Sequence, residues 1–270
     1  RARLRITEPD EAGFVADASR LQFASPLELC AIVSLANRAA SRGEPVEPVL
    51  PNDADAASYL QRMDVLRHIQ QWGTVTGNAG DDLREDRSGV LLETSAVADA
   101  VEAEAIAERV VPLARQHANA RVTQAVFMGI GELLDNACTH AKSPTAVYVA
   151  AQTYTGATSN RRGLELAVVD AGVGILEHLR RNPKYARFRH AQTAIAHAIQ
   201  PGVTGTRDRR GYGFSDVLDV VESAGLGRLV LRSGDGIGRI TVRPSGRRRL
   251  FGTCPVPITG TWAWLRVRVP

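Results

Sequence analysis

The sequence predicts an α/β protein in two parts, a small α/β unit over residues 1–72 and a larger one over residues 95–270, joined by a linker over residues 73–94. Segments with apolar residues at helical spacing alternate with short strand-like segments in both parts. Residues 73–88 are rich in Gly, Asp and Thr and lack an apolar period, as expected of a linker. With 270 residues and 44% hydrophobic content, the chain can bury a packed core.

The first part is predicted to fold in the order strand, strand, helix, strand, helix. Its first helix has apolar residues along one side, with Ser25 as the N-cap and Pro26 at the first helical position. Asp53 is the expected cap of the second helix. These elements are expected over residues 4–6, 14–16, 27–40, 45–50 and 55–69.

The second part alternates helices with strands and ends in a strand of clean alternation. Ala263 and Leu265 belong to one face of that strand, and Trp262 and Trp264 belong to the face that also carries arginines. Two tryptophans on a polar face indicate a covered surface, and the first part is a candidate cover. Helices are expected over residues 96–117, 121–141, 190–198 and 214–224, and strands over residues 146–154, 164–169, 228–233, 238–243 and 261–269.

The first chemical motif is Glu132-Leu-Leu-Asp-Asn136 on the second of these helices. Glu132 and Asn136 are one turn apart and project from the same helix face. The amide oxygen of Asn136 could ligate Mg²⁺, which prefers oxygen ligands, and Glu132 could act as general base toward a water or hydroxyl group. Alternatively, both side chains simply lie on a solvated face.

The second motif, Asp170-Ala-Gly172-Val-Gly174, follows an apolar strand. The carboxyl group of Asp170 could accept a hydrogen bond from an exocyclic amino group and so select adenine over guanine. Gly172 and Gly174 permit close backbone approach, and Ile175 is an expected wall of the same pocket. The alternative is an ordinary turn at the end of a strand.

The third motif is a glycine pair in front of a helix. Free backbone amides at a helix start bind phosphate, and neighbouring arginines add positive charge. The glycine-rich segment 202–206, which contains Thr204, precedes this motif and could form a lid over a nucleotide. A tight turn into a helix is the alternative. The residues assigned to this site are Arg209, Arg210, Gly211, Tyr212, Gly213 and Phe214.

In this order, the motifs resemble the GHKL superfamily, whose members share the Bergerat ATP-binding fold. The three segments match its asparagine box, its Asp-x-Gly-x-Gly box and its Gly-x-Gly box, and Thr261 resembles a late threonine that assists the adenine-binding aspartate. The resemblance implies a two-layer α/β sandwich of Bergerat type over residues 95–270, with a mixed sheet and helices on one face. It assigns Mg²⁺ to Asn136, adenine to Asp170, catalysis to Glu132 and the phosphates of ATP to Gly211 and Gly213.

The first part resembles STAS-type modules of bacterial regulatory proteins more distantly. Phe23-Ala-Ser25-Pro-Leu27 stands where such modules carry Asp-Ser-Ser-Gly-Leu. Because Ala24 replaces the aspartate and Pro26 stands beside the usual phosphoacceptor, Ser25 is interpreted as a helix cap.

Composition limits the remaining function classes. The net charge of +4 is small for this length, so we expect neither nucleic acid nor a membrane as partner. The three cysteines are scattered and lack metal-ligand spacing, which is typical of a cytoplasmic protein. No apolar run reaches the roughly 18 residues that a membrane span requires.

Together these observations predict an ATP-binding, Mg²⁺-dependent ATP-hydrolysing regulatory protein. Lid closure on ATP would switch an interface with a regulatory protein partner or with a second copy of the chain. Two alternatives remain open at this point: an anti-sigma-type protein serine kinase, and a non-catalytic ATP sensor or interaction module.

Overall fold

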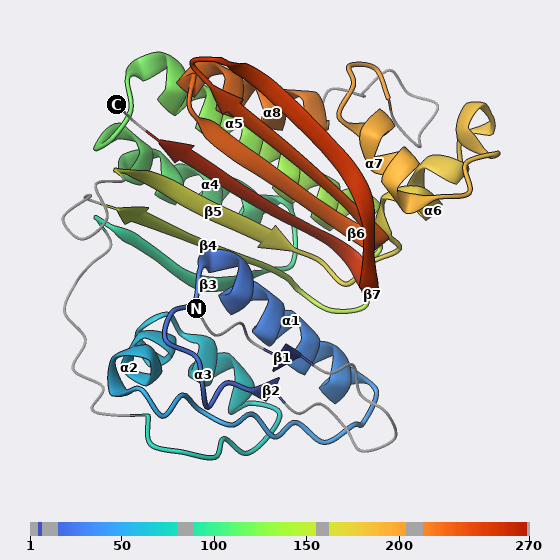
Figure 1. Ribbon diagram of the computed structural model, residues 1–270. Helices are drawn as coiled ribbons and strands as arrows, with labels where there is room; N and C mark the ends of the chain where they lie inside the picture. The colour runs from blue at the N-terminus through green and yellow to red at the C-terminus, as the bar shows by residue number, and fades with distance from the viewer. Residues whose placement is uncertain (1–4, 7–15, 80–88, 155–161, 204–212, 269–270) are drawn as a thin grey trace.

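An antiparallel sheet forms the centre of the computed structural model, which describes residues 5–6, 16–79, 89–154, 162–203 and 213–268 (Figure 1). Within this part of the chain the sheet has five strands in the order β3-β4-β5-β7-β6. Every neighbouring pair is antiparallel, so the predicted mixed sheet is wrong, whereas the α/β class is confirmed. Consecutive strands β4 and β5 are neighbours, as are β6 and β7, which favours antiparallel pairing because the chain simply reverses. The strands are Leu91–Val97 (β3), Val147–Tyr154 (β4), Gly163–Val169 (β5), Gly227–Arg243 (β6) and Gly246–Arg268 (β7).

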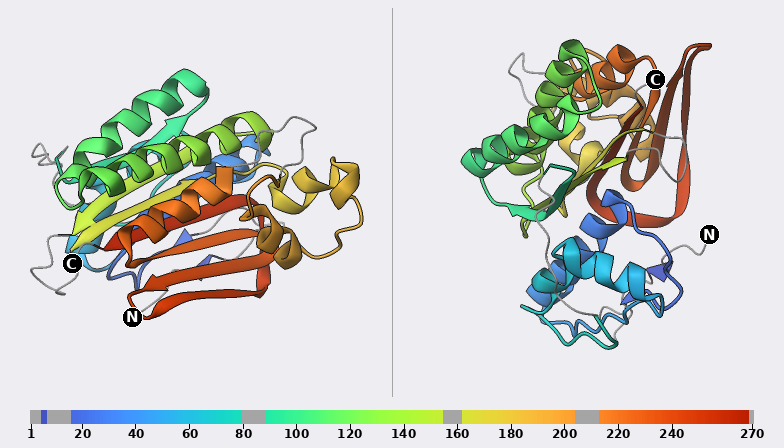
Figure 2. Two further views of the ribbon diagram at one scale, coloured as in Figure 1. Left: turned by 90° about the horizontal axis from the view of Figure 1, so that it is seen from above. Right: turned by 90° about the vertical axis from the view of Figure 1, so that its left-hand side faces the viewer.

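One face of the sheet is covered by three long helices, α4, α5 and α8 (Figures 1 and 2). In α5 the buried positions Val122, Val126, Ile130 and Leu133 recur at helical spacing, so the helix presents a continuous apolar side to the sheet. Asn119 caps it, accepting a hydrogen bond from the amide of Val122 at 3.0 Å. The helices span Ala100–Arg115 (α4), Ala120–Asp135 (α5) and Gly213–Ala224 (α8).

The opposite face is covered by α1, Pro26–Ser41, from the N-terminal part (Figure 1). Leu29 and Val33 of α1 are fully buried in one core with Val169 of β5 and Trp262 of β7. The helices of the second part that form the core with the sheet lie on one face, as predicted for residues 95–270, and the helix on the opposite face belongs to the first part. The prediction that the N-terminal part covers the tryptophan-bearing face is confirmed.

In the N-terminal part, one of the predicted strands does not form. Segment 45–50 is not a strand, and Val49 forms only isolated parallel bridges with Asp17 and Thr76. Prolines at positions 45, 48 and 51 remove amide donors from the segment, which prevents a regular ladder. The other elements are Arg5–Ile6 (β1), Ala16–Asp17 (β2), Ala54–Arg62 (α2) and Val65–Ile69 (α3).

Both predicted helix caps of the N-terminal part are confirmed. Ser25 is the N-cap of α1, and its amide donates a hydrogen bond to the carboxylate of Glu28 at 2.7 Å. Asp53 accepts from the amide of Ala56 at 2.9 Å at the start of α2. The single helix predicted over residues 55–69 is instead two helices, because Asp64 has a left-handed backbone with φ of 58°.

Three elements in the second part were not predicted. Strand β3 occupies the end of the predicted linker, and α4 begins after it at Ala100, where Asp99 accepts hydrogen bonds from two backbone amides. Two further helical segments, α6 and the short 3-10 helix η2, lie before α7 and border the site described below. Their bounds are Gly174–Arg180 (α6), Pro183–Tyr185 (η2) and Ala191–Ala198 (α7).

No helix within the described ranges is long and apolar enough to cross a membrane. Cys30, Cys138 and Cys254 are all free thiols.

Candidate functional site

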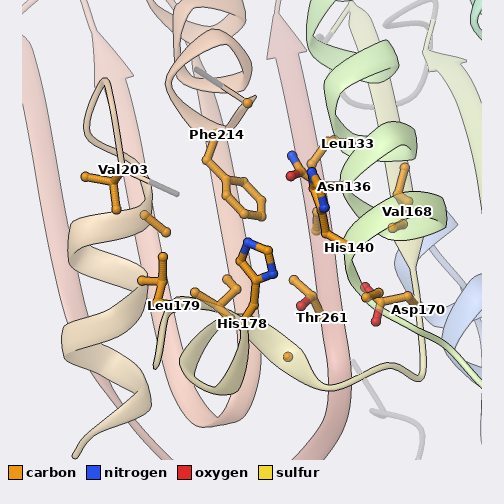
Figure 3. Close-up of a pocket in the computed structure, with 17 residues that line it drawn as sticks. Leu133, Asn136, His140, Val168, Asp170, His178, Leu179, Val203, Phe214 and Thr261 are labelled. Atoms are coloured by element: carbon orange, nitrogen blue, oxygen red, sulfur yellow. The ribbon is translucent and has the colours of Figure 1, made fainter. Parts of the chain in front are cut away.

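A pocket lies between the end of α5, the start of α8 and the ends of strands β5 and β7 (Figure 3). The space between its lining residues is about 720 Å³, a volume that includes the solvent in its open mouth. Three sequence motifs separated by many residues meet here. The predicted site residues that line the pocket are Asn136, Asp170, Gly174, Ile175, Gly213, Phe214 and Thr261.

Asp170 is a buried carboxyl group at the end of β5. Only 4% of the residue is exposed, and Oδ1 accepts a hydrogen bond from the amide of Gly172 at 2.8 Å. Burial raises the pKa of Asp170 to about 7, although backbone hydrogen bonds at Gly172 and Thr261 oppose the rise. A carboxyl group that is removed from water but faces a pocket has acceptor capacity to offer to a ligand.

The two glycines of this motif are required by the backbone around them. A β-carbon on Gly172 would lie 2.2 Å from the carbonyl oxygen of Ala141, so no larger residue fits. Gly174 has φ of 77°, a conformation that side chains disfavour, and it begins α6. The motif therefore does more than terminate a strand, because it turns the chain sharply from β5 into a helix that borders the pocket.

Glu132 and Asn136 approach the start of α8. A β-carbon placed on Gly213 would lie 2.5 Å from Nδ2 of Asn136 and 3.2 Å from Oε2 of Glu132. The first and third motifs thus lie against each other. Burial, followed by the charges of Asp216 and Asp135, raises the pKa of Glu132, which strengthens it as a proton acceptor.

The helix changes geometry at Asn136. Residues Asn136–His140 form a π-helical turn, η1, that continues α5, although an uninterrupted helix was predicted. Nδ2 of Asn136 donates to the carbonyl of Glu132 at 2.8 Å, which leaves the amide oxygen as the acceptor group of the side chain. Such π-helical turns often occur at functional sites, where they reposition a side chain.

Five predicted site residues lie outside the described residues: Thr204, Arg209, Arg210, Gly211 and Tyr212. The proposed lid over 202–206 falls largely in the same gap, and only Gly202 and Val203 are described. Of the third motif, Gly213 and Phe214 are placed, and both line the pocket.

The sequence reasoning missed one wall of the pocket, formed by His178 and Leu179 of α6 (Figure 3). Burial, with further contributions from His140 and Arg181, lowers the pKa of His178 to about 4, so its ring is neutral at pH 7. The ring centroids of His178 and His140 are 5.2 Å apart. A neutral imidazole beside Ile175 and Phe214 suits a flat, uncharged ring better than a phosphate group. The apolar pair Ile175 and Leu179, four residues apart, was the available signal for this helix.

No model of a known protein family matches this chain, and no curated protein is significantly similar to it. The site must therefore be interpreted from its own geometry.

The described residues offer few candidate ligands for a metal ion at this pocket. They contain no group of three or more His, Cys, Asp or Glu side chains that could hold a metal. Mg²⁺ commonly takes only one or two protein oxygens and completes its shell with phosphate oxygens and water. The amide oxygen of Asn136 could supply one such ligand. The pocket thus combines a buried acceptor, apolar walls and a polar edge.

Proposed function

We propose that this protein binds ATP with Mg²⁺ in the pocket between α5, α6 and α8 and hydrolyses it. The observation that carries the proposal is the meeting of three separate motifs at one pocket, with Asp170 at one end and the contact between Gly213 and Asn136 at the other. One end offers an acceptor among apolar walls, as a purine base requires. The other combines a helix start, an amide oxygen and a carboxylate, as a magnesium triphosphate requires.

At the base end, Asp170 would accept a hydrogen bond from the exocyclic amino group of adenine, with Thr261 beside it. The carbonyl oxygen that guanine carries at the corresponding position offers no hydrogen to Asp170. Since an unmatched buried polar group costs about 1–3 kcal/mol, the site should prefer ATP to GTP by about tenfold or more.

At the phosphate end, Asn136 would hold Mg²⁺ and the backbone at Gly213 would face the phosphates. Bound Mg²⁺ would neutralise charge on the phosphate oxygens. Glu132 would orient a water molecule and accept its proton, a role favoured by its raised pKa.

The direct test is isothermal titration calorimetry with ATP and GTP, with and without Mg²⁺. Asp170→Ala should abolish measurable ATP binding, whereas the matched change Asp55→Ala, at an exposed carboxylate of α2, should leave it unchanged. Failure of the wild-type protein to bind ATP, or equal binding of ATP and GTP, would overturn the proposal.

We further propose that ATP binding regulates an interface with a partner protein in the cytoplasm. The support is the position of the pocket between three helices, α5, α6 and α8, that are far apart in the sequence. Phosphate release and phosphate transfer to protein can be separated with γ-labelled ATP. Label on protein instead of free phosphate would favour the serine-kinase alternative, and binding without either would favour a sensor.

A further inference from the structure

Strands β6 and β7 concentrate the positive charge of the protein. Residues 227–268 contain nine arginines, no lysine and a single acidic residue, Asp235. The entire chain has a net charge of only +4, so the remainder must be net negative. Such a division of charge within one folded chain indicates a surface for an oppositely charged partner.

Strand register places seven of these arginines on one face of the sheet, and the part of that face that carries six of them, all except Arg268 at the end of β7, is called the arginine face. Leu229, Leu231, Ile240 and Val242 of β6 are buried in the core beneath the helices, so the residues between them point to the other side. The β7 residues that pair directly with these β6 residues lie on the same face of the sheet. The arginine face consists of Arg228, Arg232, Arg239, Arg243, Arg248 and Arg266.

The N-terminal part does not cover most of this face. The core that α1 forms with the sheet contains Trp262 and contacts Ile258 and Trp264, but it includes no described residue from 228 to 257 (Figures 1 and 2). Arg228, Arg239, Arg243 and Arg248 are all exposed. Only the face's border is neutralised, where Arg266 lies 2.7 Å from the buried carboxylate of Glu165.

The exposed arginines lack ion pairs among the residues that the structure places. Arg247, which points to the helix side, pairs with Glu222, whereas no carboxylate lies within 4.0 Å of Arg239 or Arg248. Arg228 stands directly opposite Arg266 across the two strands. Because Glu165 already neutralises Arg266, the charges available to a partner among the described residues are those of Arg228, Arg239, Arg243 and Arg248.

The side chains between the arginines favour protein over nucleic acid as that partner. Val230 and Ile237 are partly exposed, and Leu250, opposite Arg239, is 48% exposed. Arginine is enriched and lysine depleted in protein interfaces, and the partly exposed aliphatic side chains add apolar contact area to this face. Single-stranded nucleic acid binds through exposed aromatic platforms, but Phe251 pairs with Gly238 and belongs to the helix side.

We propose that the arginine face is the docking surface for an acidic, extended segment of a partner protein. Arg239, Thr241 and Arg243 alternate along β6, so the arginines repeat at about 13 Å along the strand and side chains of this face at about 7 Å. Arg248 on β7 stands opposite Thr241, so the two strands together present an arginine about every 7 Å, which a segment with a carboxylate at every second residue matches. This proposal does not depend on ATP binding.

The test uses fluorescence anisotropy with a labelled ten-residue peptide that alternates Glu and Thr. Two other probes are measured for comparison. One is a peptide of the same composition in which the five Glu residues are consecutive, and the other is a single-stranded DNA oligonucleotide of equal charge. We expect the alternating peptide to bind most tightly. The double variant Arg239→Glu with Arg248→Glu should weaken binding by about tenfold or more, because each charge reversal turns attraction into repulsion.

The matched control is Arg187→Glu with Arg189→Glu, two exposed arginines before α7, which makes the same change in net charge. It should weaken peptide binding less than threefold. An equal loss of peptide affinity in both double variants would show that only the net charge of the protein matters, and it would overturn the proposal. Tighter binding of DNA than of either peptide would overturn it in favour of nucleic acid. Circular dichroism would establish that the variants are folded.

Discussion

Ser233 on β6 accepts a hydrogen bond from the backbone amide of Ile175 on α6, with 2.9 Å between Oγ and N. Its hydroxyl in turn donates to the carbonyl of Gly260, also at 2.9 Å, and only 2% of the residue is exposed. The buried hydroxyl of Ser233 thus connects Ile175, directly after the Asp170 motif, with Gly260, directly before Thr261.

Replacing Ser233 with Ala should loosen this connection. Two buried backbone groups lose their partner, so the free energy of unfolding should fall by about 1–3 kcal/mol, and ATP affinity should fall because Asp170 and Thr261 are no longer held in register. Denaturant unfolding and calorimetry measure the two effects. Ser41→Ala, at an exposed hydroxyl that bonds the carbonyl of Arg38, is the control. Similar small effects in both variants would contradict a positioning role for Ser233.

Glu132→Gln should separate binding from turnover. The amide keeps the shape of the side chain but cannot accept a proton, so the hydrolysis rate should fall by about 100-fold or more while the ATP dissociation constant changes less than threefold. Phosphate release at saturating ATP measures the first and calorimetry the second. Glu104→Gln, the same change at an exposed glutamate of α4, should leave the rate unchanged. An unchanged hydrolysis rate in Glu132→Gln would show that Glu132 is not the general base.

Asp170 should make the stability of the protein depend on pH. Its pKa is raised by burial from 3.8 to about 7, so the folded state binds this proton more tightly than the unfolded state does. Its stabilising contribution is therefore complete below about pH 4, falls as pH rises toward 7 and is lost above it. Between pH 5 and 7 this group alone should lower the free energy of unfolding by about 2 kcal/mol. Chemical unfolding of Asp170→Asn should show a correspondingly smaller decline, and identical pH profiles would contradict the assignment.

The N-terminal part and the sheet should unfold together. Leu29 of α1 is fully buried in a core shared with strands β5 and β7, so Leu29→Ala should lower the free energy of unfolding by about 2–5 kcal/mol. Far-ultraviolet circular dichroism and tryptophan fluorescence should report a single shifted transition. Val101→Ala, at a residue that is 77% exposed, should have almost no effect. Two separate transitions, with only one shifted, would contradict a shared core.

Local sequence signals predicted the caps and several of the elements that shape the site. Ser25 and Asp53 cap their helices as expected, because a cap depends on a few adjacent residues. The sequence order of the motifs also suggested that Asn136 and Gly213 belong to one pocket. Their contact itself depends on how α5 and α8 pack, which no local pattern specifies.

The elements that the sequence did not predict are those that depend on non-local contacts or on irregular backbone geometry. Strand β3 was not predicted because its register shifts between Leu92 and Ser95. This shift interrupts the two-residue alternation of buried and exposed side chains that identifies a strand. The wall formed by His178 was missed because α6 is only seven residues long. The sequence indicated that the first part covers the second face of the sheet, but not that α1 is the helix that packs there, since the sheet begins about 50 residues after α1 ends.

The burial of β5 on both faces has an energetic consequence for the pocket. Val169 and Trp262, which pack with α1, are the immediate chain neighbours of Asp170 and Thr261. Any molecule that binds the N-terminal part and displaces α1 would disturb the packing directly behind the pocket. By thermodynamic reciprocity, a ligand in the pocket would then change the free energy of that displacement by the same amount, so the back of the sheet and the pocket would act as two coupled sites.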